Sequence, residues 1–127
     1  DLVYAKLSGA TFTGDVIGSA AALYGFKGKQ NVQTDSYTTV DGDNGKVIVM
    51  NKATAVTLTI HAAAPADFNC LVIQLGAGQV SIAASGGNVR NRSSHTKIAG
   101  QYGMVSVYVV SNAGTAPEVY VAGDTGA

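Results

Sequence analysis

Charge is scarce in this sequence, and neither sign is in excess. Charged residues make up 13% of the 127 residues, and eight basic residues are balanced by eight acidic ones. Phosphate backbones and anionic lipid surfaces attract proteins that have an excess of positive charge. No apolar run approaches the ~20 residues that a membrane-spanning helix needs. We therefore predict no nucleic-acid partner and no insertion into a membrane.

Cysteine occurs only once, so an internal disulfide is excluded. Cys70 lies in the apolar run 70–73, where a free thiol behaves as a small hydrophobic side chain. Neither His61 nor His95 has a histidine, cysteine or carboxylate partner at metal-ligand spacing. We expect Cys70 to be buried in the core, and we predict no metal site and no cofactor.

Helical periodicity is also nearly absent. No window longer than about three turns places apolar residues at helical spacing. The one candidate helix covers residues 15–23, and Gly18 inside it costs about 1 kcal/mol relative to alanine. Nevertheless, 46% of the sequence is hydrophobic, which is enough for a packed core and excludes a disordered chain.

Strand patterns are abundant. Short segments rich in β-branched residues alternate with clusters of Gly, Asn and Asp, which favour tight turns. In residues 56–60 three aliphatic side chains alternate with two threonines, as in a sheet with one face in water. The spacing predicts an all-β fold, an antiparallel β-sandwich or jelly-roll-like head. The expected strands are residues 46–50, 55–60, 71–75, 79–82 and 104–110, and the expected turns are residues 41–45, 76–78, 85–88 and 111–114.

Two segments need further packing partners. Residues 107–110 are apolar on both faces of a strand, so the strand is either central in the sandwich or covered by another subunit. Residues 1–35 hold scattered aromatic side chains among small residues, with too few large aliphatics to close a core. Such a segment is stable if it packs on the head or winds together with other copies. No methionine precedes Asp1, so we expect the chain to continue upstream.

The sequence resembles bacteriophage tail-fibre proteins in two regions. Residues 7–14, LSGATFTG, are similar to the L-S-G-G-T-F-T-G element of tail-fibre shafts. Roughly the last 90 residues resemble a head (knob) domain that recurs at the C-terminal ends of tail-fibre and tail-spike proteins. The landmarks of this head are found at residues 37–38, 43–47, 50–60, 74–80 and 99–102.

The sequence departs from the family pattern at three places. His61 stands where a proline usually follows the strand, and residues 67–69 replace an F-P-x-G sequence. A family tryptophan near the last strand is replaced around residues 119–120. These changes affect edges and loops, so they concern receptor specificity more than the fold.

The resemblance implies a homotrimer, with a shaft over residues 1–35 on the three-fold axis and a β-sandwich head over residues 36–127. It predicts a virion protein, extracellular when functional and joined to other tail proteins upstream, that binds a host-cell surface glycan or outer-membrane receptor. Avidity would make weak single sites useful. Two alternatives stay open: a structural tail-needle knob or fibre cap that binds no receptor, and a polysaccharide depolymerase.

The most polar stretch of the predicted head is residues 90–95, RNRSSH. Arginine forks and polar side chains on a loop suit sugar hydroxyls, carboxylates or phosphates, although many polar loops are merely solvated. Tyr102 and Tyr120 are either stacking platforms for sugar rings or packing residues at a sheet or subunit interface. We predict that the receptor-binding residues are Arg90, Asn91, Arg92, His95 and Tyr102.

Catalysis is not predicted. Neighbouring residues such as Ser94 and His95 rarely point into the geometry of a catalytic triad. Asp41 and Asp43 begin a calcium-loop pattern, but its later ligands are missing, so a plain turn is expected. No helix follows residues 76–78, which therefore indicate a hairpin turn rather than a phosphate cradle. A depolymerase needs paired carboxylates in a groove, and the few acids lie mostly in turns. Acids of two subunits could still meet at an interface.

Overall fold

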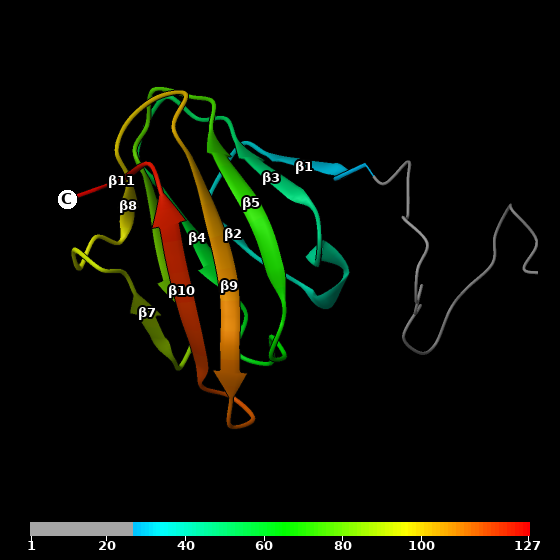
Figure 1. Ribbon diagram of the computed structural model, residues 1–127. Helices are drawn as coiled ribbons and strands as arrows, with labels where there is room; N and C mark the ends of the chain where they lie inside the picture. Colours follow the sequence, from blue (N-terminus) through cyan, green and yellow to red (C-terminus); the bar gives the residue numbers. More distant parts are fainter. Residues whose placement is uncertain (1–26) are drawn as a thin grey trace, which may run out of the picture.

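The computed structural model describes residues 27–127, which form two stacked β-sheets (Figure 1). The predicted all-β sandwich is confirmed. The six-stranded sheet has the order β1 (Gln30–Gln33), β3 (Val47–Met50), β5 (Asn69–Gln74), β9 (Met104–Asn112), β10 (Pro117–Gly123), β7 (Asn88–Arg90). The five-stranded sheet has the order β11 (Thr125–Gly126), β8 (Lys97–Ile98), β6 (Val80–Ala84), β4 (Val56–Ile60), β2 (Tyr37–Thr38).

The sheets are mixed, so the prediction of a purely antiparallel sandwich is wrong. From β1 to β9 the chain alternates between the two sheets, and as far as β6 each strand runs parallel to the preceding strand of its own sheet. Neighbours such as β3 and β5 are therefore parallel, as are β4 and β6. Val47 pairs with Leu71 and Val56 pairs with Val80, an offset of 24 residues in both cases. Later in the chain, β8 runs antiparallel to β6 and β9 runs antiparallel to β5.

The predicted turns have two different roles. Residues 76–78 do not make a hairpin, because they lead from β5 in one sheet to β6 in the other. Residues 111–114 do fall at a hairpin, in which β9 and β10 pair antiparallel. Gly114 has a φ of 106°, a conformation that a residue with a Cβ rarely adopts.

The core lies between the sheets and follows the alternation of the sequence. In β4 the side chains of Val56, Leu58 and Ile60 are buried while the two threonines are partly exposed, as predicted. In β9 the alternate residues Val105, Val107 and Val109 point inward. The other side chains of β9 point outward, so one face of this central strand is exposed.

Cys70 is buried in this core, as predicted. Burial raises the pKa of its thiol to about 12, and the charge of the nearby Asp43 acts in the same direction. A thiol with such a pKa stays protonated at physiological pH, and protonated thiols are poor nucleophiles. Cys70 therefore contributes packing.

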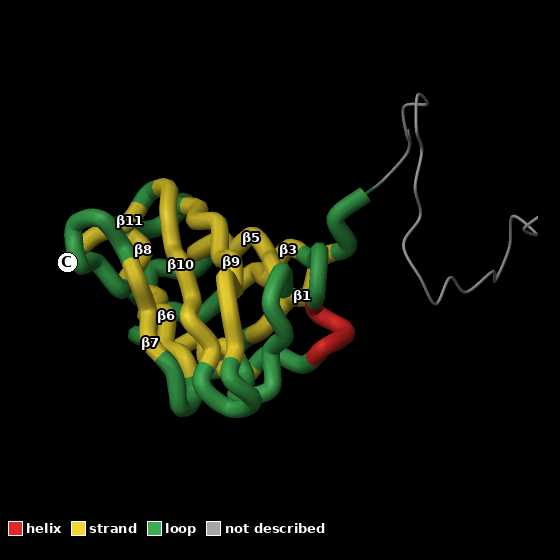
Figure 2. Tube along the Cα trace, turned by 60° about the horizontal axis from the view of Figure 1, so that its bottom comes forward, coloured by secondary structure: helices red, strands yellow, loops and turns green. Residues whose placement is uncertain are grey.

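The segment predicted as a shaft, residues 1–35, falls mostly outside the described residues, as does the candidate helix at 15–23. Residues 30–33 of that segment form β1, which pairs with β3 at the edge of the six-stranded sheet (Figure 2). Over residues 27–127, the structure has no helix with the length and hydrophobicity to cross a membrane. The short 3-10 helix η1 (Asp41–Asp43) lies beside β1.

Candidate functional site

A pocket opens where β7 ends and β10 continues. Strand β7 pairs with β10 only along Glu118–Tyr120, whereas β10 runs on to Gly123. The chain after β7 turns away from β10 and leaves a pocket of about 600 Å³ between them, within the usual range for ligand sites. Figure 1 shows β7 beside β10 at the edge of the sandwich. The pocket is lined by Val89, Arg90, Asn91, Arg92, Ser94, Tyr120, Val121 and Ala122.

Asn91 holds the loop after β7 in shape. Its Oδ1 accepts hydrogen bonds from the backbone N–H groups of Ser93 at 2.8 Å and His95 at 3.1 Å. Its Nδ2 donates to the carbonyl oxygen of Val121 at 2.9 Å. Ser94 has a left-handed φ of 59°, which the turn closed by these bonds stabilises. Asn91 therefore joins the loop to β10, and its polar atoms are already engaged.

Arg90 is also engaged. Its Nε donates to Oε2 of Glu118 at 2.9 Å, and Asn88 donates to Oε1 of the same carboxylate at 2.6 Å. The hydrogen bonds from Asn88 and then Arg90 hold the pKa of Glu118 below its ordinary value. The charge of Arg90 is thereby balanced by Glu118 beside the pocket.

Arg92 differs from Arg90. Its side chain is exposed, and among residues 27–127 it has neither an ion pair nor a side-chain hydrogen bond. Arginine is always charged at physiological pH and presents several donors in a planar fork. Arg92 is thus the cation of the pocket whose donors are available to a ligand.

The structure separates the five predicted receptor-binding residues. Arg90, Asn91 and Arg92 line the pocket together. His95 does not line the pocket, and its Nδ1 lies 3.2 Å from Oγ1 of Thr125. Tyr102 lies in the turn before β9 and is 75% exposed, and its backbone N–H donates to the carbonyl of Gln74. Tyr102 does not line the pocket.

The aromatic wall of the pocket is Tyr120, which is half exposed. Sequence reasoning considered Tyr120 as a stacking platform but did not include it among the site residues. Tyr120 and Arg92 are 28 positions apart, and the parallel pairing of β7 with β10 brings their segments together. Nothing in the local sequence indicates that pairing.

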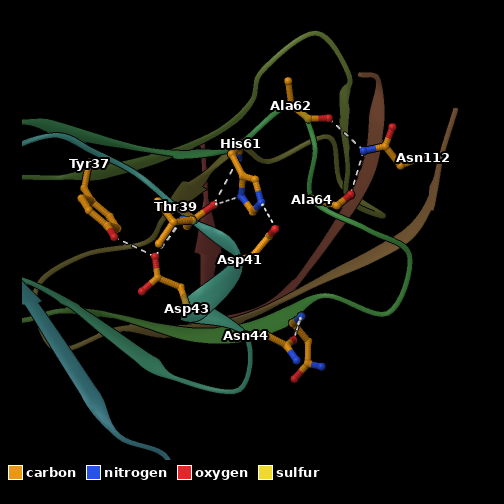
Figure 3. A network of polar contacts seen from close by, with 11 residues as sticks. Tyr37, Thr39, Asp41, Asp43, Asn44, His61, Ala62, Ala64 and Asn112 are labelled. Atoms are coloured by element: carbon orange, nitrogen blue, oxygen red, sulfur yellow. Dashed lines mark hydrogen bonds and ion pairs between the residues drawn. The ribbon is translucent and has the colours of Figure 1, made fainter. Parts of the chain in front are cut away.

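A second polar cluster surrounds Asp43, which is almost completely buried (Figure 3). Its carboxylate accepts hydrogen bonds from Tyr37 Oη at 2.7 Å, Val40 N at 2.9 Å and Asn31 Nδ2 at 2.9 Å. Burial raises the pKa of Asp43, but these hydrogen bonds, with Lys46 nearby, outweigh burial and leave the pKa below its ordinary value. Asp43 thus joins β1, β2 and η1 as a charged structural centre.

His61 lies between a hydroxyl and a carboxylate in the same region (Figure 3). Its Nδ1 is 2.7 Å from Thr39 Oγ1, and its Nε2 is 2.7 Å from Asp41 Oδ1. Carboxylate, imidazole and hydroxyl are the groups of a nucleophilic triad. However, Thr39 is only 1% exposed, and its Oγ1 also accepts the backbone N–H of His61. The Thr39 hydroxyl faces the protein interior, so it is not available to a substrate as a nucleophile. The hydrogen bonds of His61 instead hold the chain in place directly after β4.

The described part of the chain has no group of three or more side chains that could hold a metal ion. Comparisons of the sequence with protein-family models and curated proteins, and of the structure with solved structures, give no match.

Proposed function

We propose that the chain is the tip of a bacteriophage tail fibre or spike, which attaches the virion to a receptor on the bacterial surface. The observation that supports this proposal best is the pocket between β7 and β10, with Arg92 available and Tyr120 half exposed. Loops and strand ends that a rigid sheet holds in place are the usual location of recognition residues. The resemblance of residues 7–14 and of the head to tail-fibre proteins agrees with it.

Trimerisation is part of the proposal, and the outer face of the six-stranded sheet supports it. On the adjacent strands β5 and β9 this face exposes Leu71, Met104, Tyr108 and Val110, by 37% to 50%. Leu71 pairs with Ser106, which lies between Met104 and Tyr108 on the exposed face of β9, so β5 and β9 place these side chains on one continuous surface. Exposed apolar patches of this kind mark protein contacts.

In this proposal another copy of the chain packs on this face. None of β3, β5 and β9 contains a charged residue, so most of this face brings no like charges together when two copies meet. The carboxylate of Asp67, which accepts a hydrogen bond from Tyr108 at 2.6 Å, lies at one end of the face. A charged partner such as a nucleic acid or an anionic membrane finds no complementary group on these strands. Three heads held together multiply the strength of a weak receptor contact.

The test is adsorption of the purified chain to a panel of bacterial strains, with its solution mass measured by light scattering. We expect a trimer that adheres to at least one strain. Arg92→Ala should lose adsorption and stay trimeric, whereas Met104→Glu should lower the solution mass. A monomeric wild-type chain would overturn the proposal.

The second candidate function is a structural cap, which the apolar outer face favours because a cap needs subunit contacts and no receptor site. A trimer that adheres to no strain, with Arg92→Ala indistinguishable from the wild type, would support the cap. Catalysis is not part of either proposal, since no carboxylate lines the pocket and glycoside cleavage uses a pair of them.

A further inference from the structure

The charged side chains that line the pocket are both arginines. Glu118 lies beside the pocket and accepts hydrogen bonds from Arg90 and Asn88, so its negative charge balances the positive charge of Arg90. The remaining charge of the site is that of Arg92. A ligand group that enters the pocket therefore meets one positive charge and no carboxylate on its walls. Such an environment favours an anion that can accept two parallel hydrogen bonds from a guanidinium, namely a carboxylate or a phosphate.

The other walls favour a ring with polar edges. Tyr120 offers half of its surface, and the exposed Ala122 lies two residues further along the same strand. Val89 and Val121 also line the pocket, although the side chain of Val121 is almost wholly buried in the core. The apolar face of a sugar ring packs on an aromatic side chain, while its hydroxyls need donors and acceptors at the rim. Ser94 and the Tyr120 hydroxyl are polar groups of this lining.

We infer that the pocket binds an anionic carbohydrate, with its carboxylate or phosphate on Arg92 and its sugar ring on Tyr120. This inference rests on the proposed function and names the chemistry of the receptor. The loop is already held by Asn91, so Arg92 is presented from a fixed backbone and little ordering is needed on binding. The same chemistry occurs in acidic capsular sugars and in phosphorylated cell-wall or lipopolysaccharide sugars.

The experiment is a titration of the isotope-labelled full chain, followed by the NMR signals of its backbone amides. Three probes are compared: trigalacturonate, which has carboxylates, glucose 6-phosphate, which has a phosphate, and the neutral maltotriose. We expect at least one anionic probe to shift the amides of residues 90–94 and 120–122, and maltotriose at the same concentration to leave them unchanged. The anionic probe that binds identifies which kind of sugar the site prefers.

Variants separate charge from shape. Arg92→Ala should weaken the anionic probe by about tenfold or more, because a hydrogen-bonded charge contact is lost. Arg92→Lys keeps the positive charge but loses the planar guanidinium, so its affinity for the anionic probe should lie between those of the wild type and Arg92→Ala. Lys29→Ala removes a positive charge beyond the opposite edge of the sheet and should bind like the wild type. Tyr120→Phe should retain binding and Tyr120→Ala should lose it.

The outcomes distinguish the inference from the proposed function. If maltotriose binds as well as the anionic probes, or if neither anion shifts the pocket amides, the inference is wrong. Should the chain adhere to cells in that case, the attachment function stands with another ligand. If an anionic probe binds in the pocket but no strain is bound, the site is supported and the attachment function fails. Binding that persists unchanged at high salt would also contradict a charge contact at the exposed Arg92.

Discussion

A Cβ atom on Gly78 would overlap the backbone carbonyl of Thr54, because the turn after β5 lies directly against the turn after β3. Gly76 stands in the same relation to Lys52. The two turns lie together because the strands that flank them are paired with a constant offset of 24 residues. Glycine at these positions therefore lets successive crossovers of the sandwich come into backbone contact.

Replacing Gly78 tests this contact. Gly78→Ala should lower the free energy of unfolding by about 3 kcal/mol, because the added methyl group has to displace backbone. Urea unfolding followed by circular dichroism measures the change. Gly42→Ala is the matched control, since a Cβ there meets nothing within 4 Å, and its effect should stay within about 0.5 kcal/mol. Equal effects of the two substitutions would contradict the stacked arrangement.

Asp43 should make stability depend on pH in acid. Its pKa in the folded protein lies below the ordinary value of 3.8, so the unfolded chain takes up the proton first as the pH falls. The contribution of Asp43 is complete above that ordinary value and is lost as the pH drops through the folded pKa.

Asp43→Asn isolates this contribution. The amide cannot replace a carboxylate that accepts from Tyr37, Val40 and Asn31, so the variant should be less stable by about 2 to 4 kcal/mol at neutral pH. The difference between wild type and variant should shrink as the pH falls below 4, which thermal unfolding across a pH series measures. The comparison is needed because Asp35 and Glu118 also have lowered pKa values. A difference that stays constant down to the lowest pH would argue against the charged centre.

The thiol of Cys70 should be unreactive in the folded protein. It is 3% exposed and its pKa is raised to about 12 by burial, so both access and thiolate formation are suppressed. An aromatic disulfide that releases a coloured thiolate on reaction with a free thiol measures this. At mildly alkaline pH it should detect almost no free thiol until denaturant is added, and then one per chain. Rapid reaction without denaturant would show that the β5 region opens readily.

Asn91 should matter through the shape of the loop. Asn91→Ala removes the side chain that accepts from Ser93 and His95 and donates to Val121, at a cost of about 1 to 2 kcal/mol of stability. The amides of residues 93 and 95 should then exchange faster with deuterium, and ligand affinity at the pocket should fall. Ser93→Ala is the control, because its side chain makes no hydrogen bond among the described residues. Unchanged exchange in Asn91→Ala would remove its positioning role.

The long strands could be predicted from the sequence because burial on one face leaves an alternating pattern, as in residues 56–60 and 104–110. The short strands β7, β8 and β11 have two or three residues each, too few for a pattern, and their pairing partners define them. Parallel pairing was missed because glycine-rich turns at residues 76–78 look alike whether they reverse the chain or carry it to the other sheet.

The candidate site was predicted only in part, for a related reason. Arg90, Asn91 and Arg92 are consecutive, so their polarity is visible in the sequence as one stretch. Whether each side chain is available depends on partners far along the chain, such as Glu118 for Arg90.

The 24-residue offset between paired strands is also hard to see in the sequence, because the matching positions share hydrophobicity rather than identity. Residues 47–49 are VIV, and the residues 24 positions later, 71–73, are LVI.

Because β5–β6 follows β3–β4 with a constant offset of 24 residues, the two segments are successive units of equal length across the sandwich. Each such unit contributes one strand to each sheet, so the width of the molecule is counted in units of one strand spacing, about 4.8 Å. Duplication or deletion of one 24-residue unit would move the β7–β10 edge away from β1, or toward it, by one such increment. The geometry gives evolution, or a designer, a way to adjust the reach of the pocket in discrete steps without rebuilding the pocket itself.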